Sequence, residues 1–237
     1  MAKMKKENPT RIMIIKTATE MFFERGFSKT TAAALSKKAE ISTGNLTFYF
    51  PTKEHVLAEL VRMMCEFQWQ MMEEATDEGK SSLLAYCLEL TIMAALSEDN
   101  EQMHDFYVST YRSPMTLEII RQNDTEKLKR VFADYGRDWS DERFYEVECI
   151  VSGIEYATLM TPAEIMPLPT KIRNALNAVM LLLGVPEELR NKKIEKVLAM
   201  DYRAIGQRLF NDFKAYTHEK NEQAVEQMLA AYHLKND

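Results

Sequence analysis

Side chains with hydroxyl, amide and ammonium groups are concentrated between Thr30 and Lys53, where the sequence reads TTAAALSKKAEISTGNLTFYFPTK. Hydroxyls and ammonium groups are common partners of phosphate oxygens, and the amide of Asn45 has the geometry to pair with an adenine edge. Gly44, directly before it, lets a backbone come close to a partner. These residue types predict contact with nucleic acid.

Two short helices are expected to position these groups. Thr30 is a candidate N-cap of the first helix, because a threonine side chain accepts hydrogen bonds from the free amides of a first turn. Residues 40–42 form the connection, and Ser42 caps a second helix over residues 43–49. The next helix begins at Lys53. Two helices joined by about three residues form a helix-turn-helix, whose second helix can enter a major groove.

The net charge of −6 is divided unevenly along the chain. Residues 1–53 hold ten Lys and Arg against four acids, or +6, which leaves 20 basic against 32 acidic residues, or −12, for residues 54–237. A basic head on an acidic body concentrates the attraction for phosphate at one end. Lys29, Lys37 and Lys38 are of particular interest, because they lie within or beside the helix-turn-helix.

The rest of the chain also follows helical spacing. Residues 11–25 form an amphipathic helix that Gly26 ends. From Lys53 a helix of about six turns is long enough to join the head to a separate body, and a turn follows at residues 77–80. Further helices are expected over residues 81–96, 103–111, 115–135 (kinked or broken near Asn123-Asp124), 144–160, 172–183, 187–219 and 221–234.

Composition bounds the class of protein. The chain is 46% hydrophobic and 28% charged, with only seven Gly and seven Pro, which suits a globular protein built from long helices. Cys65, Cys87 and Cys149 are widely spaced, a pattern that gives neither a disulfide framework nor a zinc site and fits a reducing compartment. The sequence contains no signal peptide and no apolar run of membrane-spanning length. A cytoplasmic location is therefore expected.

Residues 11–57 resemble, without gaps, the N-terminal domain of TetR-family transcriptional regulators. The resemblance covers about a fifth of the chain and rests on Ile14-Ile15, Ala18, Met21-Phe22, Arg25-Gly26-Phe27, Thr30-Thr31, Leu35, Ala39, Ile41-Ser42, Gly44, Leu46, Phe50, Lys53-Glu54 and Val56-Leu57. It implies an all-α protein. A three-helix helix-turn-helix DNA-binding domain, residues 9–53, would be followed by a larger helical ligand-binding and dimerisation domain, residues 54–237.

By the same resemblance, some residues of the head face bases and others face phosphates. The groove-facing set is Thr43, Gly44, Asn45 and Phe48, and the phosphate-facing set is Thr30, Thr31, Thr47, Tyr49 and Lys53. The family commonly has Gly where this chain has Glu40, so either the turn is less tightly wound or Glu40 tolerates the geometry. Thr47 and Tyr49 replace the usual Tyr and His, which leaves open which hydroxyl reaches a phosphate.

The resemblance also assigns a dimer interface to the helices at residues 144–160 and 172–183, which would form a four-helix bundle with a partner. The residues assigned to it are Gly153, Ala157, Ala175, Ala178 and Leu182. Packing inside one chain is the competing interpretation for each of them. Dimerisation is favoured because one short helix reads too few base pairs, whereas two related by a dyad read a palindrome.

Aromatic and methionine residues in the middle of the chain are candidates for an adaptable ligand pocket, since the unbranched side chain of Met fills irregular shapes. The candidates are Trp69, Met93, Met103, Phe106, Tyr107, Tyr111, Tyr156 and Met160. Ordinary core packing is the alternative for all of them.

The sequence thus predicts a DNA-binding transcriptional regulator. It is expected to be a homodimeric repressor that a small-molecule ligand in the C-terminal domain releases from a palindromic operator of double-stranded DNA. The alternative is a DNA-anchored module regulated by a protein partner. No enzyme, cofactor or membrane partner is predicted, because there is no nucleophile elbow, phosphate-binding loop or functional carboxylate pair. The four histidines, His55, His104, His218 and His233, show no metal-ligand spacing.

Overall fold

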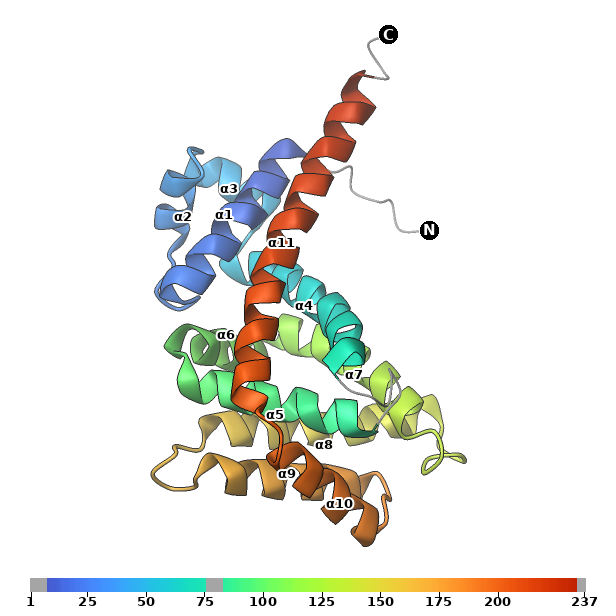
Figure 1. Cartoon of the computed structure of the whole chain (residues 1–237). Coiled ribbons are helices and arrows are strands. Elements are labelled where there is room, and N and C mark those ends of the chain that lie inside the picture. Colours follow the sequence, from blue (N-terminus) through green and yellow to red (C-terminus); the bar gives the residue numbers. More distant parts are fainter. Residues whose placement is uncertain (1–7, 76–82, 234–237) are drawn as a thin grey trace.

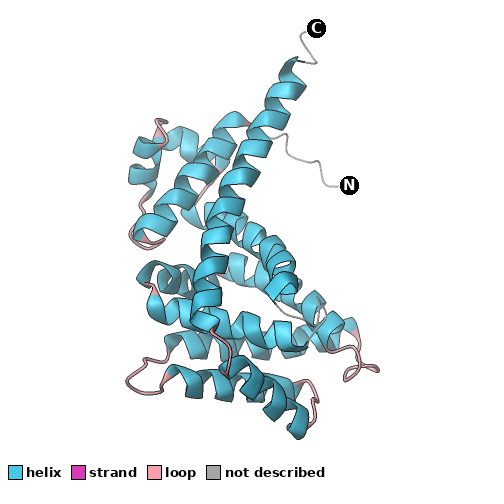
Figure 2. Ribbon diagram, viewed as in Figure 1, coloured by secondary structure: helices cyan, strands magenta, loops and turns pink. Residues whose placement is uncertain are grey.

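The computed structural model describes residues 8–75 and 83–233, which form helices joined by short connections, with no strand among them (Figure 2). This confirms the predicted all-α class. The expected turn at residues 77–80 lies outside the described residues. The helices are α1 (Pro9–Arg25), α2 (Ala32–Lys38), α3 (Thr43–Tyr49), α4 (Lys53–Ala75), α5 (Leu83–Asp99), α6 (Glu101–Arg112), α7 (Pro114–Val131), α8 (Asp141–Met160), α9 (Leu168–Leu182), α10 (Glu187–Leu198) and α11 (Tyr202–His233).

Helices α1 to α3 form a small head at one end of the molecule (Figure 1). One face of α1, which includes the fully buried Ile14 and Met21, belongs to the same hydrophobic core as Leu35 of α2 and Leu46 of α3. The three helices therefore hold each other through apolar side chains, and α1 packs in addition against α4, α6 and α11.

Side-chain caps decide where α2 and α3 begin. Ser42 accepts a hydrogen bond from the amide of Asn45 at 3.0 Å, as the sequence predicts for the start of α3. The predicted cap of α2 is wrong by one residue. Thr31 is the N-cap and accepts from Ala34, whereas the hydroxyl of Thr30 is buried and donates to the carbonyl of Gly26. Thr30 therefore points into the head.

The turn between α2 and α3 is tightly wound despite the absence of glycine. Glu40 has a φ of 53°, in the left-handed region. The amide of Ile41 bonds to the carbonyl of Ser36 at 3.0 Å, and that of Glu40 bonds to Lys37 at 3.3 Å. This is a Schellman ending, which usually places Gly at the left-handed residue. Of the two possibilities that the sequence left open, Glu40 thus adopts the glycine geometry.

Helix α5 is the central element of the body. From Leu83 to Ser97 every residue except Glu89 is buried, so the helix has no solvent-facing side. A helix that is apolar all round must be covered all round. Helices α4, α6, α8, α9, α10 and α11 all pack against it, as the arrangement in Figure 1 shows.

Helix α7 is a single helix from Pro114 to Val131, so the predicted kink or break near Asn123-Asp124 is wrong. The polar side chains are satisfied locally, because the Asn123 amide donates to the Asp124 carboxylate at 2.8 Å, as does Lys127 from the next turn. None of these side chains competes for the hydrogen bonds of the helix backbone.

The C-terminal part divides differently from the prediction. The single run expected over residues 187–219 is interrupted after Leu198, and α11 then continues without a break through the segment expected as a separate helix at 221–234, as far as His233. Asp201 supplies the physical reason, because its carboxylate accepts from the amide of Ala204 at 3.1 Å and so caps a new helix.

Helix α11 gives the head a second attachment to the body besides α4. It runs along α1 and crosses α4 (Figure 1). Phe23 of α1 meets the rings of Phe210 and Phe213 edge-on, with centroids 5.5 and 5.8 Å apart, and Phe213 also contacts Phe67 of α4 at 5.2 Å. This aromatic cluster joins the first helix of the head to the last helix of the chain.

Phe213→Ala is expected to destabilise the protein by about 3–5 kcal/mol, the usual cost of truncating a buried phenylalanine. Phe213 is only 4% exposed and lies between α1 and α4. Urea unfolding followed by circular dichroism measures the change. Phe48→Ala, at a side chain that is 79% exposed, is the matched control and should shift stability by less than about 0.5 kcal/mol. Equal effects of the two would show that the aromatic cluster does not hold the head.

Glu40→Gly is expected to stabilise the protein by about 1 kcal/mol, because glycine adopts a left-handed backbone without the steric cost of a Cβ atom. Ala33→Gly, at an exposed position inside α2, should do the opposite and cost about 1 kcal/mol. Thermal unfolding of the parent and the two variants shows whether each substitution raises or lowers the midpoint. A lower midpoint for Glu40→Gly would contradict the assigned turn geometry.

Candidate nucleic-acid interface and buried acidic site

Helix α3 presents its polar face and one large apolar side chain to solvent. Leu46 is buried, whereas Thr43, Asn45 and Thr47 are exposed. Phe48 is 79% exposed, the highest value among the exposed large hydrophobic side chains, and its ring stands edge-on to that of Tyr49. The burial of an exposed phenylalanine would be favourable, so this face is suited to contact with another molecule.

Gly44 has no conformational reason to be glycine. Its φ is not positive, and a Cβ atom added there would meet only the Ser42 Oγ, at 3.9 Å. Glycine inside a helix costs up to about 1 kcal/mol relative to alanine. The fold therefore does not require glycine here, and its small size leaves room for the close approach of another molecule.

The predicted phosphate contacts divide into outward and inward side chains. Thr31 and Thr47 are exposed, although the Thr47 hydroxyl donates within its own helix, and Tyr49 is half-buried. Thr30 is 1% exposed. Lys53 donates to the carbonyls of Phe27 at 3.0 Å and Thr30 at 3.3 Å, and its ammonium lies 4.1 Å from the Phe27 ring centroid.

Lys53 and Thr30 therefore fasten the connection between α1 and α2. The Thr30 hydroxyl proton is used inside the head, whereas the half-buried Lys53 ammonium keeps one of its three N–H groups for a further acceptor.

Much of the positive charge of the head is already paired. Lys38 lies 3.3 and 3.4 Å from the carboxylates of Glu20 and Glu24, and Lys29 lies 2.7 Å from Glu101 of α6. Lys37 is exposed and makes no ion pair within residues 8–75 and 83–233. Exposed ion pairs contribute little energy and exchange readily, so the paired lysines stay available to phosphates at small cost.

The connection between α1 and α2 is also held by the body. Asp105 of α6 accepts hydrogen bonds from both the amide and the hydroxyl of Ser28. Gly26 makes this approach possible, because it has a φ of 93° and a Cβ atom there would lie 2.7 Å from Asp105 Oδ2. The glycine predicted as the end of the first helix thus also makes room for α6.

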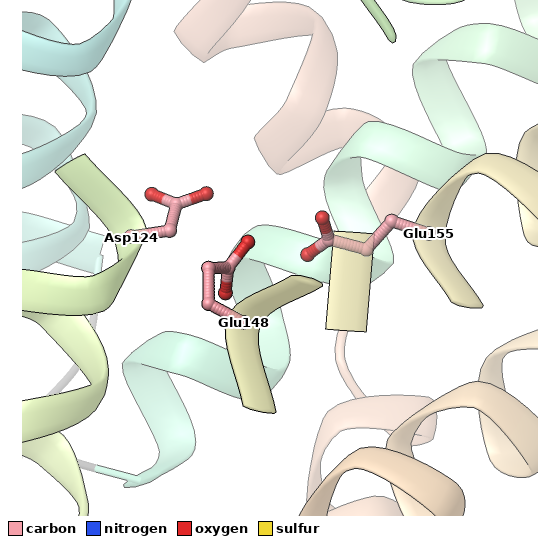
Figure 3. Close-up of side chains that lie close together, drawn as sticks. All are labelled: Asp124, Glu148 and Glu155. Atoms are coloured by element: carbon pink, nitrogen blue, oxygen red, sulfur yellow. The ribbon is translucent and has the colours of Figure 1, made fainter. Parts of the chain in front are cut away.

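A cluster of carboxylates is buried inside the body, and we call it the acidic site. It comprises Asp124 of α7 and Glu148 and Glu155 of α8, which offer one oxygen each within 4.8 Å of one another (Figure 3). Tyr111 donates to Glu155 Oε2 at 2.7 Å. The buried Lys127 donates to Asp124 Oδ1 at 2.8 Å and also pairs with Glu89.

Burial and mutual repulsion act on the titration of this site. Burial, followed by the charge of Asp124, raises the pKa of Glu155 to about 8. The same causes, together with the charge of Glu155, hold the pKa of Glu148 well above its usual value. Burial alone would lower the pKa of Lys127, but the carboxylates of Asp124 and Glu89 outweigh it and raise this pKa. Lys127 is therefore a permanent cation.

Two small cavities adjoin in the body. The first, of about 30 Å³, is lined by residues that include Tyr86, Asp124 and Glu155, and burial raises the pKa of the Cys65 thiol on its wall to about 12. The second, of about 40 Å³, is apolar and lined by residues that include Met103 and Phe213. Met64, Gln68, Glu89, Met93 and Tyr107 line both.

The predicted ligand residues are distributed unevenly around these cavities. Met93, Met103, Tyr107 and Tyr111 line them. Phe106 is buried core, and Tyr156 stacks on Tyr111 from outside both linings. Trp69 lies beneath the cations of Lys127 and Arg130, and Met160 is 46% exposed on the outer face of α8.

Sequence reasoning missed the charged wall of the first cavity, since it found no carboxylates with a reason to be paired. A signal was present in α8. Glu148 and Glu155 are seven residues apart, on the same stripe as the buried Phe144, Val147 and Val151. Glutamate on an apolar helix face is rarely buried without a partner, so this stripe pointed to a polar site.

The predicted dimer residues lie mainly on an open face of α8 and α9. Gly153, Ala157 and Leu182 are exposed, Ala178 is half-buried, and a Cβ atom at Gly153 would meet nothing within 4 Å. Ala175 differs, because it is 4% exposed and packs inside the chain. The same face carries further exposed apolar side chains that were not predicted, namely Ile150, Met160 and Leu181.

No described helix is long and apolar enough to span a membrane. Within the described residues, the side chains that are close enough together to hold a metal ion are the three carboxylates of the acidic site. No histidine belongs to this group.

Comparison with known proteins agrees with the geometry of the head. A family model described as bacterial regulatory proteins, tetR family, matches residues 14–60. An uncharacterized HTH-type transcriptional regulator, YuxN of Bacillus subtilis, is 28% identical over 148 residues, which are 58% of this chain and 51% of YuxN. The HTH-type transcriptional regulator QacR of Staphylococcus aureus is 37% identical over 57 residues, 24% of this chain and 30% of QacR.

The chain thus spans about half the length of YuxN and less than a third of QacR in these matches. Among solved structures, Salmonella enterica GusR is similar with a TM-score of 0.47 and 21% identity, over 77% of this chain and 98% of GusR. The family match covers α2, α3 and most of α1, the elements that form the helix-turn-helix and its support. The N-terminal part of the chain, residues 14–60, is thus similar to the bacterial regulatory proteins of the tetR family.

Proposed function

We propose that this protein is a DNA-binding transcriptional regulator, in which residues 9–53 bind an operator and residues 54–237 dimerise and bind a small ligand. The exposed face of α3 carries the proposal. Gly44, Asn45 and Phe48 lie together on a short helix whose opposite side is anchored in the head. An amide to read an adenine edge, a glycine for close approach and an apolar ring to touch thymine methyls suit a major groove.

A dimer would supply the second half of the DNA contact. Exposed apolar or small side chains recur along one face of α8 at residues 150, 153, 157 and 160, a helical spacing. Leu181, at 58% exposure, and Leu182 extend this face onto α9. Two such helices from each of two chains can pack as a four-helix bundle, which would bury the apolar face and relate the heads by a dyad.

Repression with release by a ligand is the proposed output. The first cavity is lined by α4, α5, α6, α7 and α8, and the second by α4, α5, α6 and α11. Helix α6, which lines both, also holds the connection between α1 and α2 through Asp105. A ligand that binds more tightly to one position of α6 would favour that position. The position of the head linked to it would then become more populated, to an extent set by the difference in affinity. Heads that enter successive major grooves must lie about 34–36 Å apart, so a modest displacement weakens DNA binding.

Asn45→Ala is expected to change sequence preference, with a loss of about 1–3 kcal/mol at the base pair that Asn45 reads. Lys37→Ala should weaken binding to all sequences alike and reduce the salt slope by about one unit, because it removes one phosphate contact. Selection of genomic fragments, followed by salt-dependent binding assays, measures both. Lys192→Ala, an exposed lysine on α10, is the control and should change neither. If the parent protein binds all genomic fragments equally well, the proposal is wrong.

Ile150→Asp is expected to convert the dimer to a monomer, because it places a carboxylate in the middle of the apolar face of α8 and α9. Light scattering coupled to size exclusion measures the mass. Met13→Asp, at a half-exposed apolar position on α1, is the matched control and should keep the mass of the parent. A parent protein that is monomeric at micromolar concentration would contradict the assigned interface.

A further inference from the structure

We propose that the acidic site binds one divalent metal ion through the carboxylates of Asp124, Glu148 and Glu155. The proposal that this ion is the ligand of the body rests on the proposed function. Ion binding itself is a property of the protein without DNA, and it stands on the geometry of three side chains from α7 and α8 (Figure 3).

Each carboxylate keeps an oxygen for the ion. Asp124 Oδ1 accepts from Lys127 and Asn123, and Glu155 Oε2 accepts from Tyr111. Within the described residues, no hydrogen bond reaches Asp124 Oδ2, Glu155 Oε1 or either oxygen of Glu148. The bonds that are made therefore orient two of the ligands and leave three carboxylates able to converge on one point. Such partners of a ligating carboxylate are the usual support of a metal site.

Glu148 is the strongest sign of a ligand. Its side chain is 1% exposed, and among the described residues neither oxygen has a hydrogen-bond partner. Figure 3 shows its carboxylate between those of Asp124 and Glu155. A buried polar group without a partner is costly and calls for a specific reason.

Tyr86 adds an independent observation from α5. Its hydroxyl is buried and has no partner in the part of the chain that the structure describes, and its ring lines the cavity beside Asp124 and Glu155. A phenol in this position can donate a hydrogen bond to a water molecule on the ion, as outer-shell groups of metal sites do. Tyr86 thus lines the same cavity as Asp124 and Glu155, the two carboxylates that Glu148 accompanies in the cluster.

The charge balance also favours a cation. Glu89, Asp124, Glu148 and Glu155 surround a single ammonium, that of Lys127. Lys127 is paired with Glu89 and Asp124, so it does not neutralise Glu148. Carboxylates so close together can all be ionised only when a further cation joins them, and otherwise some of them take up protons. A divalent ion supplies that charge in the space that the cluster leaves.

Size and ligand chemistry select the kind of cation. The adjoining cavity of about 30 Å³ holds an ion with one or two waters, whereas drug-sized ligands occupy pockets of about 300 Å³ or more. All three ligands are oxygens, which hard ions such as Mg²⁺, Mn²⁺ and Ca²⁺ prefer. Two oxygens on opposite sides of Ca²⁺ lie about 4.6–5.2 Å apart, so the 4.8 Å limit of the cluster already suits it, and smaller ions need a slight closure.

The test measures binding of Mn²⁺, Mg²⁺ and Ca²⁺ to the full-length protein after dialysis against a chelator. Isothermal titration gives stoichiometry and affinity, and the loss of the free Mn²⁺ electron paramagnetic resonance signal reports binding directly. We expect one ion per chain and a rise in the thermal midpoint with at least one of the three ions. Glu148→Gln, which keeps the volume and removes the charge, should weaken the affinity at least tenfold.

Glu142→Gln, at an exposed glutamate in the first turn of the same helix, is the matched control and should bind like the parent. In chelator-treated samples Glu148→Gln should unfold at the same or a higher temperature than the parent, because a glutamine amide can donate to a neighbouring carboxylate, whereas the Glu148 carboxyl group has no partner within the described residues. If it does not fold, Glu155→Gln and Asp124→Asn replace it in the same titration. Absence of binding to the parent at millimolar ion, or an equal loss in Glu142→Gln, overturns the assignment.

A lipophilic organic cation, tetraphenylphosphonium, provides the contrasting arm. If it binds in a Glu148-dependent manner and the metal ions do not, the acidic site serves an organic cation and the metal assignment is wrong. DNA binding with and without the bound ion is measured separately. A protein that binds no ion could still bind its operator, and a protein that binds no operator could still bind an ion. The two proposals can therefore fail independently of each other.

Discussion

The body is organised by the requirement that α5 be covered on every side. A helix with buried side chains from Leu83 to Ser97 can be stable only at the centre of other helices, and most of the body helices pack against it. Glu89 is the one position of this run that is not fully buried, and it lies where α5 faces Lys127. The most apolar helix of the chain thus forms one wall of the most charged part of the interior.

Because the acidic site is buried against α5, it lowers the stability of the fold. The same burial holds its carboxylates in a position suited to a cation. Burial of several carboxylates around one lysine costs free energy that apolar replacements would not. Two of the three clustered carboxylates are held in place by donors, namely Lys127 to Asp124 and Tyr111 to Glu155, whereas Glu148 has none within the described residues. Sites that bind or react commonly keep such unfavourable groups in position through the fold around them.

The head is attached to this body at three places with different physics. Helix α4 continues directly from the helix-turn-helix, α11 contributes aromatic packing between Phe213 and Phe23, and α6 contributes the hydrogen bonds between Asp105 and Ser28. Aromatic packing resists separation but tolerates small sliding, whereas hydrogen bonds at a tight turn resist both. Helix α6 links the head to the acidic site, because it supplies Asp105 to Ser28 and Tyr111 to Glu155.

The sequence by itself determined the helices of the head and their similarity to the tetR family. Ser42 as a cap, residues 43–49 as a helix and Gly26 as a helix end are all local signals, because caps and turns depend on neighbours within a few residues. Local reasoning failed by one residue at Thr30, where a hydroxyl bond to Gly26 inside the head competed with capping.

The tertiary structure alone decided which side chains meet across the body. Ser28 and Asp105 are 77 residues apart, Tyr111 and Glu155 are 44 apart, and Lys127 and Glu89 are 38 apart. Periodicity assigns a residue to a buried face but does not say which other face it will touch, since any two apolar stripes can pack. The glutamates of α8 could be placed on such a stripe from sequence. Only the packing of α7 against α8 brings Asp124 to them.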